Sequence, residues 1–245
     1  MKLKIKNLSI GYGHQAVLSD IDITARSGDF IALIGKNGSG KSTFLKTLAG
    51  ILEAIEGEIL MDGQDLLQLK PTERAKYVSI VLTDAILTPL KVKEFISLGR
   101  QNFTGTWNRL LPEDHRIINQ VIQELNLTDL LNKKITEISD GERQKVLISR
   151  ALVQETPIVL LDEPTTHLDL ENKAVLLKKL KKISQMQNKI IILSTHDINL
   201  ILPQTNKVWF TNHSIETLEK NQSLKGLFDL DLLRYDEACQ IFRLV

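Results

Sequence analysis

The sequence has a single cysteine, no long apolar run and almost no net charge, and each absence excludes a class of protein. Cys239 has no second cysteine with which to form an internal disulfide, which fits a reducing compartment. No stretch approaches the ~18 consecutive apolar residues that a membrane-spanning helix needs. The net charge of +1 gives no basis for a nucleic-acid footprint, so we expect no nucleic-acid partner.

The composition is that of an ordinary globular protein. The chain has 245 residues, of which 42% are hydrophobic and 25% charged, enough for one large or two small domains with a substantial core. Residues 1–6 alternate charged and apolar side chains, which is typical of a half-exposed strand and not of a secretion signal. We therefore expect a cytosolic chain that can dock on a component of the membrane.

One stretch fits the pattern G-x-x-x-x-G-K-[ST] without a gap: Gly35-Lys36-Asn37-Gly38-Ser39-Gly40-Lys41-Ser42. An apolar run (30–34) precedes it and a helical pattern (43–49) follows, which is the strand–loop–helix context that the motif needs. The glycines let backbone N–H groups point at phosphate oxygens. Lys41 can reach the β- and γ-phosphates, and the Ser42 hydroxyl can hold Mg²⁺. The sequence therefore predicts a nucleoside triphosphate site with Mg²⁺.

Two carboxylates follow a later apolar run. Residues 158–161 read as a buried strand that ends at Asp162 and Glu163. This places both carboxylates at the carboxyl edge of a sheet, where α/β folds bind ligands. Asp162 suits a Mg²⁺ ligand, direct or through water, and Glu163 suits a general base that activates water. Alone this signal is weak, but beside a phosphate loop it is strong.

The remaining patterns predict an α/β protein. The region from about 85 to 155 has helical periodicity, including a helix that opens at Pro112. A lysine-rich crossover helix is expected over 171–184, with the lysines on a solvated face. Strands are expected over 3–10, 21–25, 30–34, 58–61, 77–82, 158–161 and 190–193.

Together these motifs resemble the ATP-binding cassette (ABC) family along nearly the whole chain. Ile138-Ser139-Asp140-Gly141-Glu142 stands where that family has its Leu-Ser-Gly-Gly-Gln signature. Residues 166–169 resemble its D-loop, and residues 194–197 resemble its H-loop. Tyr12 resembles the aromatic residue that stacks on adenine.

The resemblance implies an α/β P-loop NTPase with a parallel central sheet, an N-terminal antiparallel β-subdomain and an inserted helical subdomain. The expected boundaries are about 1–84 and 156–245 for the core with its β-subdomain, and 85–155 for the helical subdomain. It also implies that two copies pair head to tail, so that each ATP lies between the phosphate loop of one copy and the signature of the other.

The site residues follow from the motifs and the resemblance together. The expected catalytic residues are Glu163, His196 and Lys41. The expected metal ligands are Ser42, Asp162 and Thr83. Contacts to ATP are expected from Tyr12, Gly35, Lys36, Asn37, Gly38, Ser39, Gly40, Lys41, Ser42, Thr43, Ser139, Gly141, Glu142 and Asp169.

Two positions depart from the family's pattern. Asp140 adds a carboxylate near a polyanion, so we expect it to point away or to pair with a cation such as Arg143. Thr83 stands where a glutamine should follow the strand 77–82. The threonine side chain is shorter than that of glutamine, so we expect its hydroxyl to act on Mg²⁺ through a bridging water. The alternative is that Thr83 merely ends the strand.

Residues 92–100 resemble the Val-x-Glu-x-Val-x-x-Gly-Arg stretch of cassettes that import iron–siderophore, haem or cobalamin chelates. This implies a transmembrane permease partner, indirectly a substrate-binding protein, and a location in the cytoplasm on the inner face of the plasma membrane. The alternative is a soluble cassette such as an iron–sulfur cluster assembly ATPase. The apolar residues expected either to meet the permease or to join the helical core are Phe95, Leu98, Phe103, Trp107 and Leu110.

Overall fold

Six strands form the central sheet, and five of them run parallel. The computed structural model describes residues 1–83, 86–103, 109–218, 233–236 and 241–244. The order of the central sheet is β10-β9-β3-β8-β7-β6, in which β10 alone runs antiparallel to its neighbour. Its strands are β3 (Phe30–Gly35), β6 (Val78–Val81), β7 (Ile158–Leu161), β8 (Ile190–Ser194), β9 (Lys207–Asn212) and β10 (Ser214–Leu218).

A second sheet is antiparallel and comes from the N-terminal part of the chain. Its order is β2-β1-β4-β5, with β1 (Lys2–Tyr12), β2 (Gln15–Arg26), β4 (Ala54–Met61) and β5 (Gln64–Asp65). Several of these strands are longer than the alternation of apolar residues predicts. The register of β1 shifts between Ile5 and Leu8, and Asn7 between them has a φ of 45°. Such a bulge interrupts the period of two without ending the strand.

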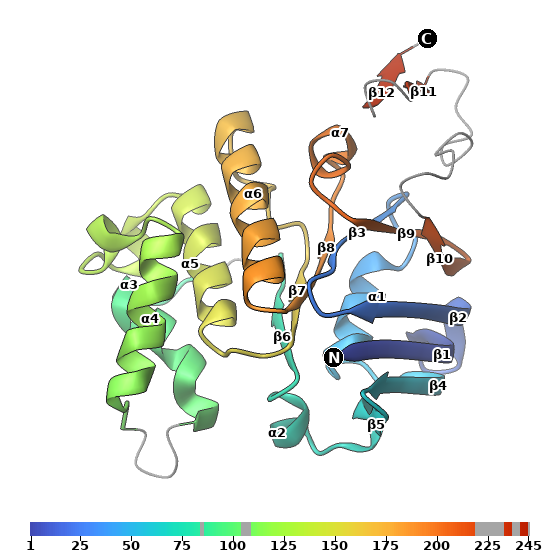
Figure 1. The fold of residues 1–245 in the computed structure, drawn as a ribbon, viewed down its shortest axis with the longest axis horizontal. Coiled ribbons are helices and arrows are strands. Elements are labelled where there is room, and N and C mark those ends of the chain that lie inside the picture. The colour runs from blue at the N-terminus through green and yellow to red at the C-terminus, as the bar shows by residue number, and fades with distance from the viewer. Residues whose placement is uncertain (84–85, 104–108, 219–232, 237–240, 245) are drawn as a thin grey trace.

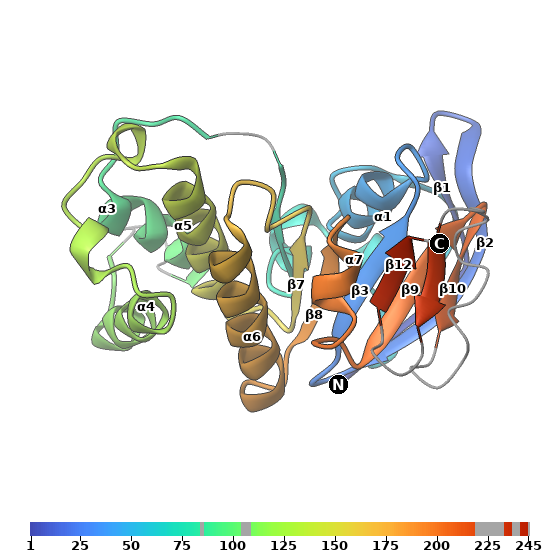
Figure 2. The same cartoon turned by 90° about the horizontal axis from the view of Figure 1, so that it is seen from above.

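The helices lie in two places relative to the central sheet. α1 (Lys41–Leu48) lies between the two sheets, whereas α6 (Leu170–Met186) covers the opposite face of the central sheet. α3 (Val92–Ser97), α4 (Pro112–Glu124) and α5 (Asp140–Leu152) are grouped beyond β6, on the side away from the antiparallel sheet (Figure 1 and Figure 2). The short helices are α2 (Pro71–Arg74), α7 (Ile198–Ile201), η1 (Leu66–Gln68), η2 (Leu98–Phe103), η3 (Thr128–Leu130) and η4 (Ile135–Glu137).

Two apolar clusters hold these layers together. One joins the α1 side of the central sheet to the antiparallel sheet, with Phe44 set edge-on against Trp209 at a ring separation of 6.0 Å. The other joins the opposite face to α6 and to the helical group. Both clusters share the central strands, since successive side chains of a strand point to opposite faces. This explains why β7 and β8 are apolar at almost every position.

After β10, the described residues of the C-terminal segment, 233–236 and 241–244, form a sheet of their own and do not pair with the central sheet. β11 (Leu233–Asp236) and β12 (Ile241–Leu244) pair with each other as a separate antiparallel hairpin. The alternation of Phe242 and Leu244 is compatible with an edge strand of a larger sheet, but these residues pair with β11 instead, and Val245 lies outside the described residues. A short alternating segment shows that it can form a strand, but not which strand it will pair with.

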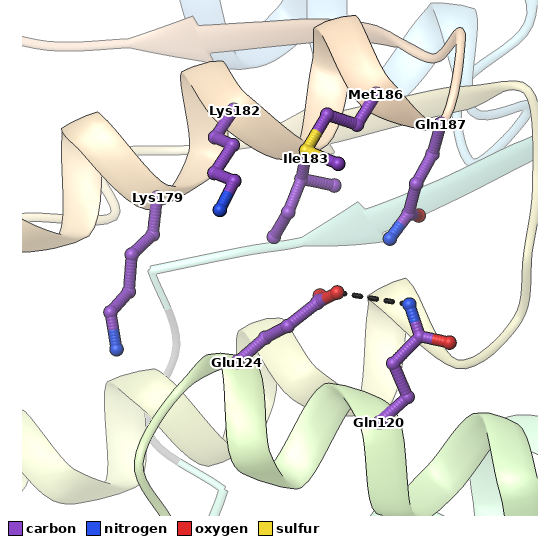
Figure 3. A pocket seen from close by; sticks show the side chains of 7 residues that line it. All are labelled: Gln120, Glu124, Lys179, Lys182, Ile183, Met186 and Gln187. Carbon is purple, nitrogen blue, oxygen red and sulfur yellow. Dashed lines mark hydrogen bonds between the residues drawn. The ribbon is translucent and has the colours of Figure 1, made fainter.

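A groove of about 340 Å³ runs between α4 and α6 (Figure 3). Glu124 accepts a hydrogen bond from Gln120 at 3.0 Å on one wall, and Lys179 stands on the other. Burial lowers the pKa of Lys179, and nearby Lys145 lowers it further, against the opposing charge of Glu124. Of the four lysines predicted on the solvated face of α6, Lys178 and Lys182 are exposed, whereas Lys179 and Lys181 are half-buried, and Lys182 lines this groove with Lys179. None of the expected site residues lines this groove.

The Gly99-Arg100 pair has a structural role in the helical group. A Cβ on Gly99 would lie 2.4 Å from the carbonyl oxygen of Arg150, so only glycine fits this close approach. Arg100 is 5% exposed, and its Nε lies 2.7 Å from Asp114 Oδ1. Its guanidinium also bonds the carbonyl oxygen of Val153 at 2.8 Å and the carboxylate of Glu155 at 3.0 Å. This buried cation thus ties η2 to α4 and to the end of α5.

Removal of the Asp114 charge should destabilise the helical group. We expect Asp114→Asn to lower the free energy of unfolding by about 2 to 3 kcal/mol, because it leaves Arg100 buried with one carboxylate fewer. The neighbouring Glu113→Gln removes an exposed ion pair with Arg116 and should change stability little. Urea unfolding of both variants measures the difference, and equal stabilities would contradict this role for Arg100.

The wild type and Asp114→Asn should differ in how their free energies of unfolding depend on pH. Burial raises the pKa of Asp114, but hydrogen bonds from the Leu111 N–H and from Arg100 outweigh it, so the pKa lies below its ordinary value of 3.8. A depressed carboxyl pKa contributes stability above the unfolded-state pKa, and this is lost as the pH falls through the folded-state pKa. Below about pH 4 the wild type should therefore approach the stability of Asp114→Asn.

Candidate nucleotide-binding site

The phosphate-binding motif forms the turn between β3 and α1. β3 ends at Gly35, and α1 begins at Lys41. Gly40, the N-cap of α1, has a φ of 93°, in the left-handed region that favours glycine. A Cβ on Gly35 would lie 1.9 Å from Thr211 Oγ1 on β9, so this position is closed to any larger residue. The loop therefore takes the shape that the motif predicts, with the helix N-terminus at its end.

Lys41 folds back into this loop. Its Nζ donates to the carbonyl oxygens of Gly35 at 2.9 Å and Lys36 at 3.0 Å, and the residue is only 6% exposed. Burial lowers the pKa of Lys41, and the negative charges of Glu163 and Asp162 oppose that shift. An ammonium has three N–H donors, so it can bind one more acceptor at the mouth of the loop.

The two carboxylates expected after β7 lie beside the phosphate loop. Asp162 is 4% exposed and accepts a hydrogen bond from Ser194 Oγ at 2.6 Å. Glu163 Oε1 lies 2.7 Å from His196 Nε2. β7 and β8 are neighbours and parallel, so the residues that follow them emerge at one edge. Three segments far apart in the sequence, the phosphate loop, Asp162–Glu163 and Ser194–His196, are thus brought together.

Thr83 also lies at this edge. Its hydroxyl is 3.4 Å from the carbonyl oxygen of Asp162, in donor geometry. Ser42, Asp162 and Thr83 offer only oxygen atoms, which is the ligand type that Mg²⁺ prefers. A carboxylate has about four lone-pair positions, so the bond from Ser194 leaves Asp162 able to accept from a metal-bound water. The residues present therefore fit a Mg²⁺ ion that takes the rest of its shell from phosphate and water.

Tyr12 stands at the end of β1, close to the phosphate loop. Its ring is largely open to solvent, and its hydroxyl lies 3.4 Å from Thr43 Oγ1 in α1. An exposed ring beside the loop is available for stacking on a base. Tyr12 and Thr43 therefore lie together beside the phosphate loop.

The signature segment caps α5. Ser139 Oγ accepts from the Glu142 N–H at 3.3 Å, and Glu142 Oε2 accepts from the Ser139 N–H at 2.8 Å, which is a capping box. The bond from the Ser139 N–H lowers the pKa of Glu142 most, and the Ser139 hydroxyl, which donates to the same carboxylate at 2.9 Å, lowers it further against the effect of burial. Asp140 pairs with Arg143 at 2.6 Å, which confirms the expected partner. Arg143 therefore draws the additional carboxylate toward itself.

Asp169 and Gly141 join the signature segment to α6. Asp169 is the N-cap of α6 and accepts from the Asn172 N–H at 2.7 Å, while Asn172 Oδ1 accepts from Lys145 on α5 at 2.8 Å. A Cβ on Gly141 would lie 3.1 Å from the carbonyl oxygen of His167. Residues 167 and 168 of the segment that resembles the D-loop therefore pack directly on the start of α5. Asp169, which the sequence predicts to contact nucleotide, caps α6.

Sequence reasoning missed two buried hydroxyls of this edge. Ser194 bonds Asp162, and Thr211 on β9 lies within hydrogen-bond distance of Ser39 in the phosphate loop. Ser194 lies in the segment 194–197 that resembles the H-loop, but its bond to Asp162 was not expected, and Thr211 belongs to none of the motifs. The signal for both is positional, because each is a polar residue that follows at least three consecutive apolar residues near the end of its strand.

The fold and this loop define a P-loop nucleotide-binding protein. Residues 18–166 match the profile of the ABC transporter family, so the chain belongs to this family. Within the described ranges, every helix is too short or too polar to traverse a bilayer.

Several relatives span nearly the whole chain. An uncharacterized ABC transporter ATP-binding protein of Methanocaldococcus jannaschii is 37% identical over 99% of this chain and 86% of its own length. The iron(3+)-hydroxamate import ATP-binding protein FhuC of Bacillus subtilis is 32% identical over 99% of this chain and 88% of its own. The achromobactin transport ATP-binding protein CbrD of Dickeya dadantii is also 32% identical, over 92% of this chain and 87% of its own.

Solved structures agree with the fold. An inward-facing metal-chelate type ABC transporter superposes with a TM-score of 0.76 at 30% identity, covering 89% of this chain and 82% of that chain. A dimeric ATP-binding cassette bound to ADP and phosphate gives a TM-score of 0.77 at 25% identity, covering 89% of this chain and 98% of that one.

The capping role of Ser139 can be separated from any contact with nucleotide. We expect Ser139→Ala to lower the free energy of unfolding, without nucleotide, by about 1 kcal/mol, because the N–H of Glu142 loses its acceptor. Ser139→Thr keeps a hydroxyl and should retain most of the stability. Thermal unfolding of both variants tests this, and an Ala variant as stable as the wild type would show that the cap contributes nothing.

Proposed function

We propose that this chain binds and hydrolyses MgATP to drive import of an iron–siderophore, haem or cobalamin-type chelate through a membrane permease. The observation that carries the enzymatic part is the meeting of the phosphate loop, the Asp162–Glu163 pair and His196 at one sheet edge. The import part is supported by relatives named for iron(3+)-hydroxamate and achromobactin transport. These names favour a transporter over an iron–sulfur cluster assembly ATPase.

In the proposed reaction, water attacks the γ-phosphorus of ATP. Its oxygen forms the new P–O bond, the bond to the β–γ bridging oxygen breaks, and ADP leaves with that electron pair. Glu163 orients the water and takes its proton, while His196 holds the Glu163 carboxylate before nucleotide arrives and then contacts the γ-phosphate. Lys41 and the loop N–H groups stabilise the charge that develops on the phosphate oxygens.

Mg²⁺ supplies charge neutralisation of the phosphates when it is bound. Ser42 and Asp162 would hold it, and Thr83 would act through a water. The remaining proposed contacts to ATP come from the phosphate loop, Tyr12 and Thr43 in the same copy.

Two copies are proposed to complete each other's sites. Ser139 and Gly141 lie at the start of α5, where Ser139 and Glu142 form the capping box, and Asp169 caps the start of α6. In the proposed head-to-tail dimer, Ser139, Gly141, Glu142 and Asp169 of one copy face the nucleotide on the phosphate loop of the other. A solved cassette of 25% identity that is dimeric and bound to ADP and phosphate supports the pairing of two copies.

The domain division proposed is 1–84 and 156–245 for the core with its β-subdomain, and 85–155 for the helical subdomain. The permease is proposed to dock where the two meet, on the cytoplasmic face of the membrane. A cavity of about 340 Å³ lies there, lined in part by Ile80, Ile86 and Leu147, and Leu87 beside it is 67% exposed.

The apolar residues that the sequence offered for this contact lie elsewhere or are not described. Phe95 is a core residue, and Leu98 and Leu110 pack against that core. The Phe103 side chain and Trp107 lie outside the described residues.

Loss of the Glu163 carboxylate should stop turnover but not binding. We expect Glu163→Gln to lower the ATPase rate roughly 100-fold or more, since a general base typically contributes that much. With MgATP it should accumulate as a dimer in size-exclusion chromatography with light scattering. Glu171→Gln, an exposed change at the start of α6, is the control. A Glu163→Gln protein with wild-type turnover would contradict the assignment.

The Thr83 hydroxyl should influence the metal requirement. We expect Thr83→Val to raise the Mg²⁺ concentration for half-maximal ATPase activity several-fold, because the β-branched shape stays and only the hydroxyl is lost. Thr205→Val is the matched control, since Thr205 likewise bonds a backbone carbonyl at 3.4 Å but lies away from the phosphate loop. Unchanged Mg²⁺ dependence in Thr83→Val would show that Thr83 merely ends its strand.

A further inference from the structure

Ser194 is a fully buried hydroxyl at the end of β8, between the two strands that lead into the site. Its register partner on β3 is Leu33, two residues before the phosphate loop begins. On the other side, Leu193 pairs with Leu161, the last residue of β7 before Asp162. Ser194 is therefore surrounded by the chain segments that bear the expected metal ligands and general base.

Strand alternation puts Ser194 and Asp162 on the same face of the sheet. The first and third residues of β7 and of β8 pack in the core around α1: Ile158, Leu160, Ile190 and Ile192. Two residues further along each strand direction come Asp162 and Ser194. An apolar residue at 194 would continue the pattern of β8, so packing alone does not call for a hydroxyl there.

This hydroxyl makes two hydrogen bonds to the segment after β7. It donates its one proton to Asp162 Oδ1 at 2.6 Å, and it accepts from the backbone N–H of Glu163 at 2.9 Å. Asp162 is 4% exposed, and a buried carboxylate is costly unless it receives hydrogen bonds. The first bond therefore fixes where that carboxylate points.

The second bond holds an unusual backbone. Glu163 has a φ of 49°, in the left-handed region that residues other than glycine seldom adopt. From this conformation its side chain reaches His196 at 2.7 Å. A hydrogen bond from the Glu163 N–H to Ser194 stabilises the turn, and with it the direction of the carboxylate.

We propose that Ser194 is a positioning residue for MgATP hydrolysis, which sets the Asp162 carboxylate and the Glu163 turn through one hydroxyl. The inference rests on the proposed function, because it requires Asp162 to act on Mg²⁺ and Glu163 on water. Ser194 acts through these two residues and touches neither nucleotide nor metal.

The test compares Ser194→Ala, Ser194→Thr and a control at another position of the same sheet, Ser79→Ala. Ser79 on β6 is 2% exposed and accepts a hydrogen bond from Thr156 Oγ1 at 2.9 Å, so its loss removes a similar buried bond away from the phosphate loop. For each protein we would measure kcat and KM for ATP. We would also measure the affinity for a fluorescent ATP analogue with EDTA and as Mg²⁺ is titrated in.

For Ser194→Ala we expect kcat to fall about tenfold or more, which corresponds to the loss of one charge-assisted hydrogen bond. The Mg²⁺ concentration for half-maximal analogue binding should rise several-fold, while affinity in EDTA stays unchanged. Ser194→Thr keeps the hydroxyl, so it should retain most of kcat and most of the Mg²⁺ dependence of analogue binding. Ser79→Ala should match the wild type in all of these, whatever its thermal stability.

A Ser194→Ala protein with wild-type kcat and Mg²⁺ dependence would overturn the inference. So would a loss of analogue affinity that is equal with and without Mg²⁺. If Ser194→Ala does not fold, Ser194→Cys keeps the volume with a weaker donor, and the same pattern is expected from it. Failure of the proposed function is seen separately, as a wild type without ATPase activity or a Glu163→Gln protein with full activity.

Discussion

The burial of the Asp162 carboxylate at a common edge of parallel strands is the constraint on which the site depends. β3, β8 and β7 run side by side in the same direction, so their carboxyl ends meet at one edge. The phosphate loop follows β3, Ser194 is the last residue of β8, and Asp162 follows β7. A carboxylate that is 4% exposed needs a fixed donor, and the neighbouring strand provides it. The positions of Glu163 and His196 follow from that arrangement.

The two apolar clusters and a buried ion pair hold together the elements around this edge. α1 is clamped between both sheets through Phe44 and Trp209, so the loop that precedes it has a firm base. The helical group is held by a different set of contacts, including the buried Arg100 with its carboxylate partners. The signature segment lies at the start of α5, whose buried apolar residues belong to the same apolar cluster as the central strands and α6. This arrangement suits a protein in which a second copy completes the nucleotide-binding site.

Much of this could be predicted from the sequence, because the decisive signals are local. β7 has the predicted bounds, and the phosphate loop follows from glycine spacing and flanking patterns. β2 begins six residues earlier than predicted, at Gln15, since bulges in its pairing with β1 hide the alternation. The hydrogen bonds of Ser194 and Thr211 were not predicted, although Ser194 lies in the segment that resembles the H-loop, because their partners are set by strand register. The pairing of β11 with β12 could not be predicted for the same reason.

The most direct test of the central claim is a crystal structure of the wild-type chain with Mg²⁺ and a non-hydrolysable ATP analogue. We expect the γ-phosphate between Lys41 of one copy and Ser139 of a second. The metal should bind Ser42 and lie next to Asp162, directly or through one water, with the bond from Ser194 intact. Nucleotide bound elsewhere, or a metal remote from Asp162 in an otherwise filled site, would contradict the account.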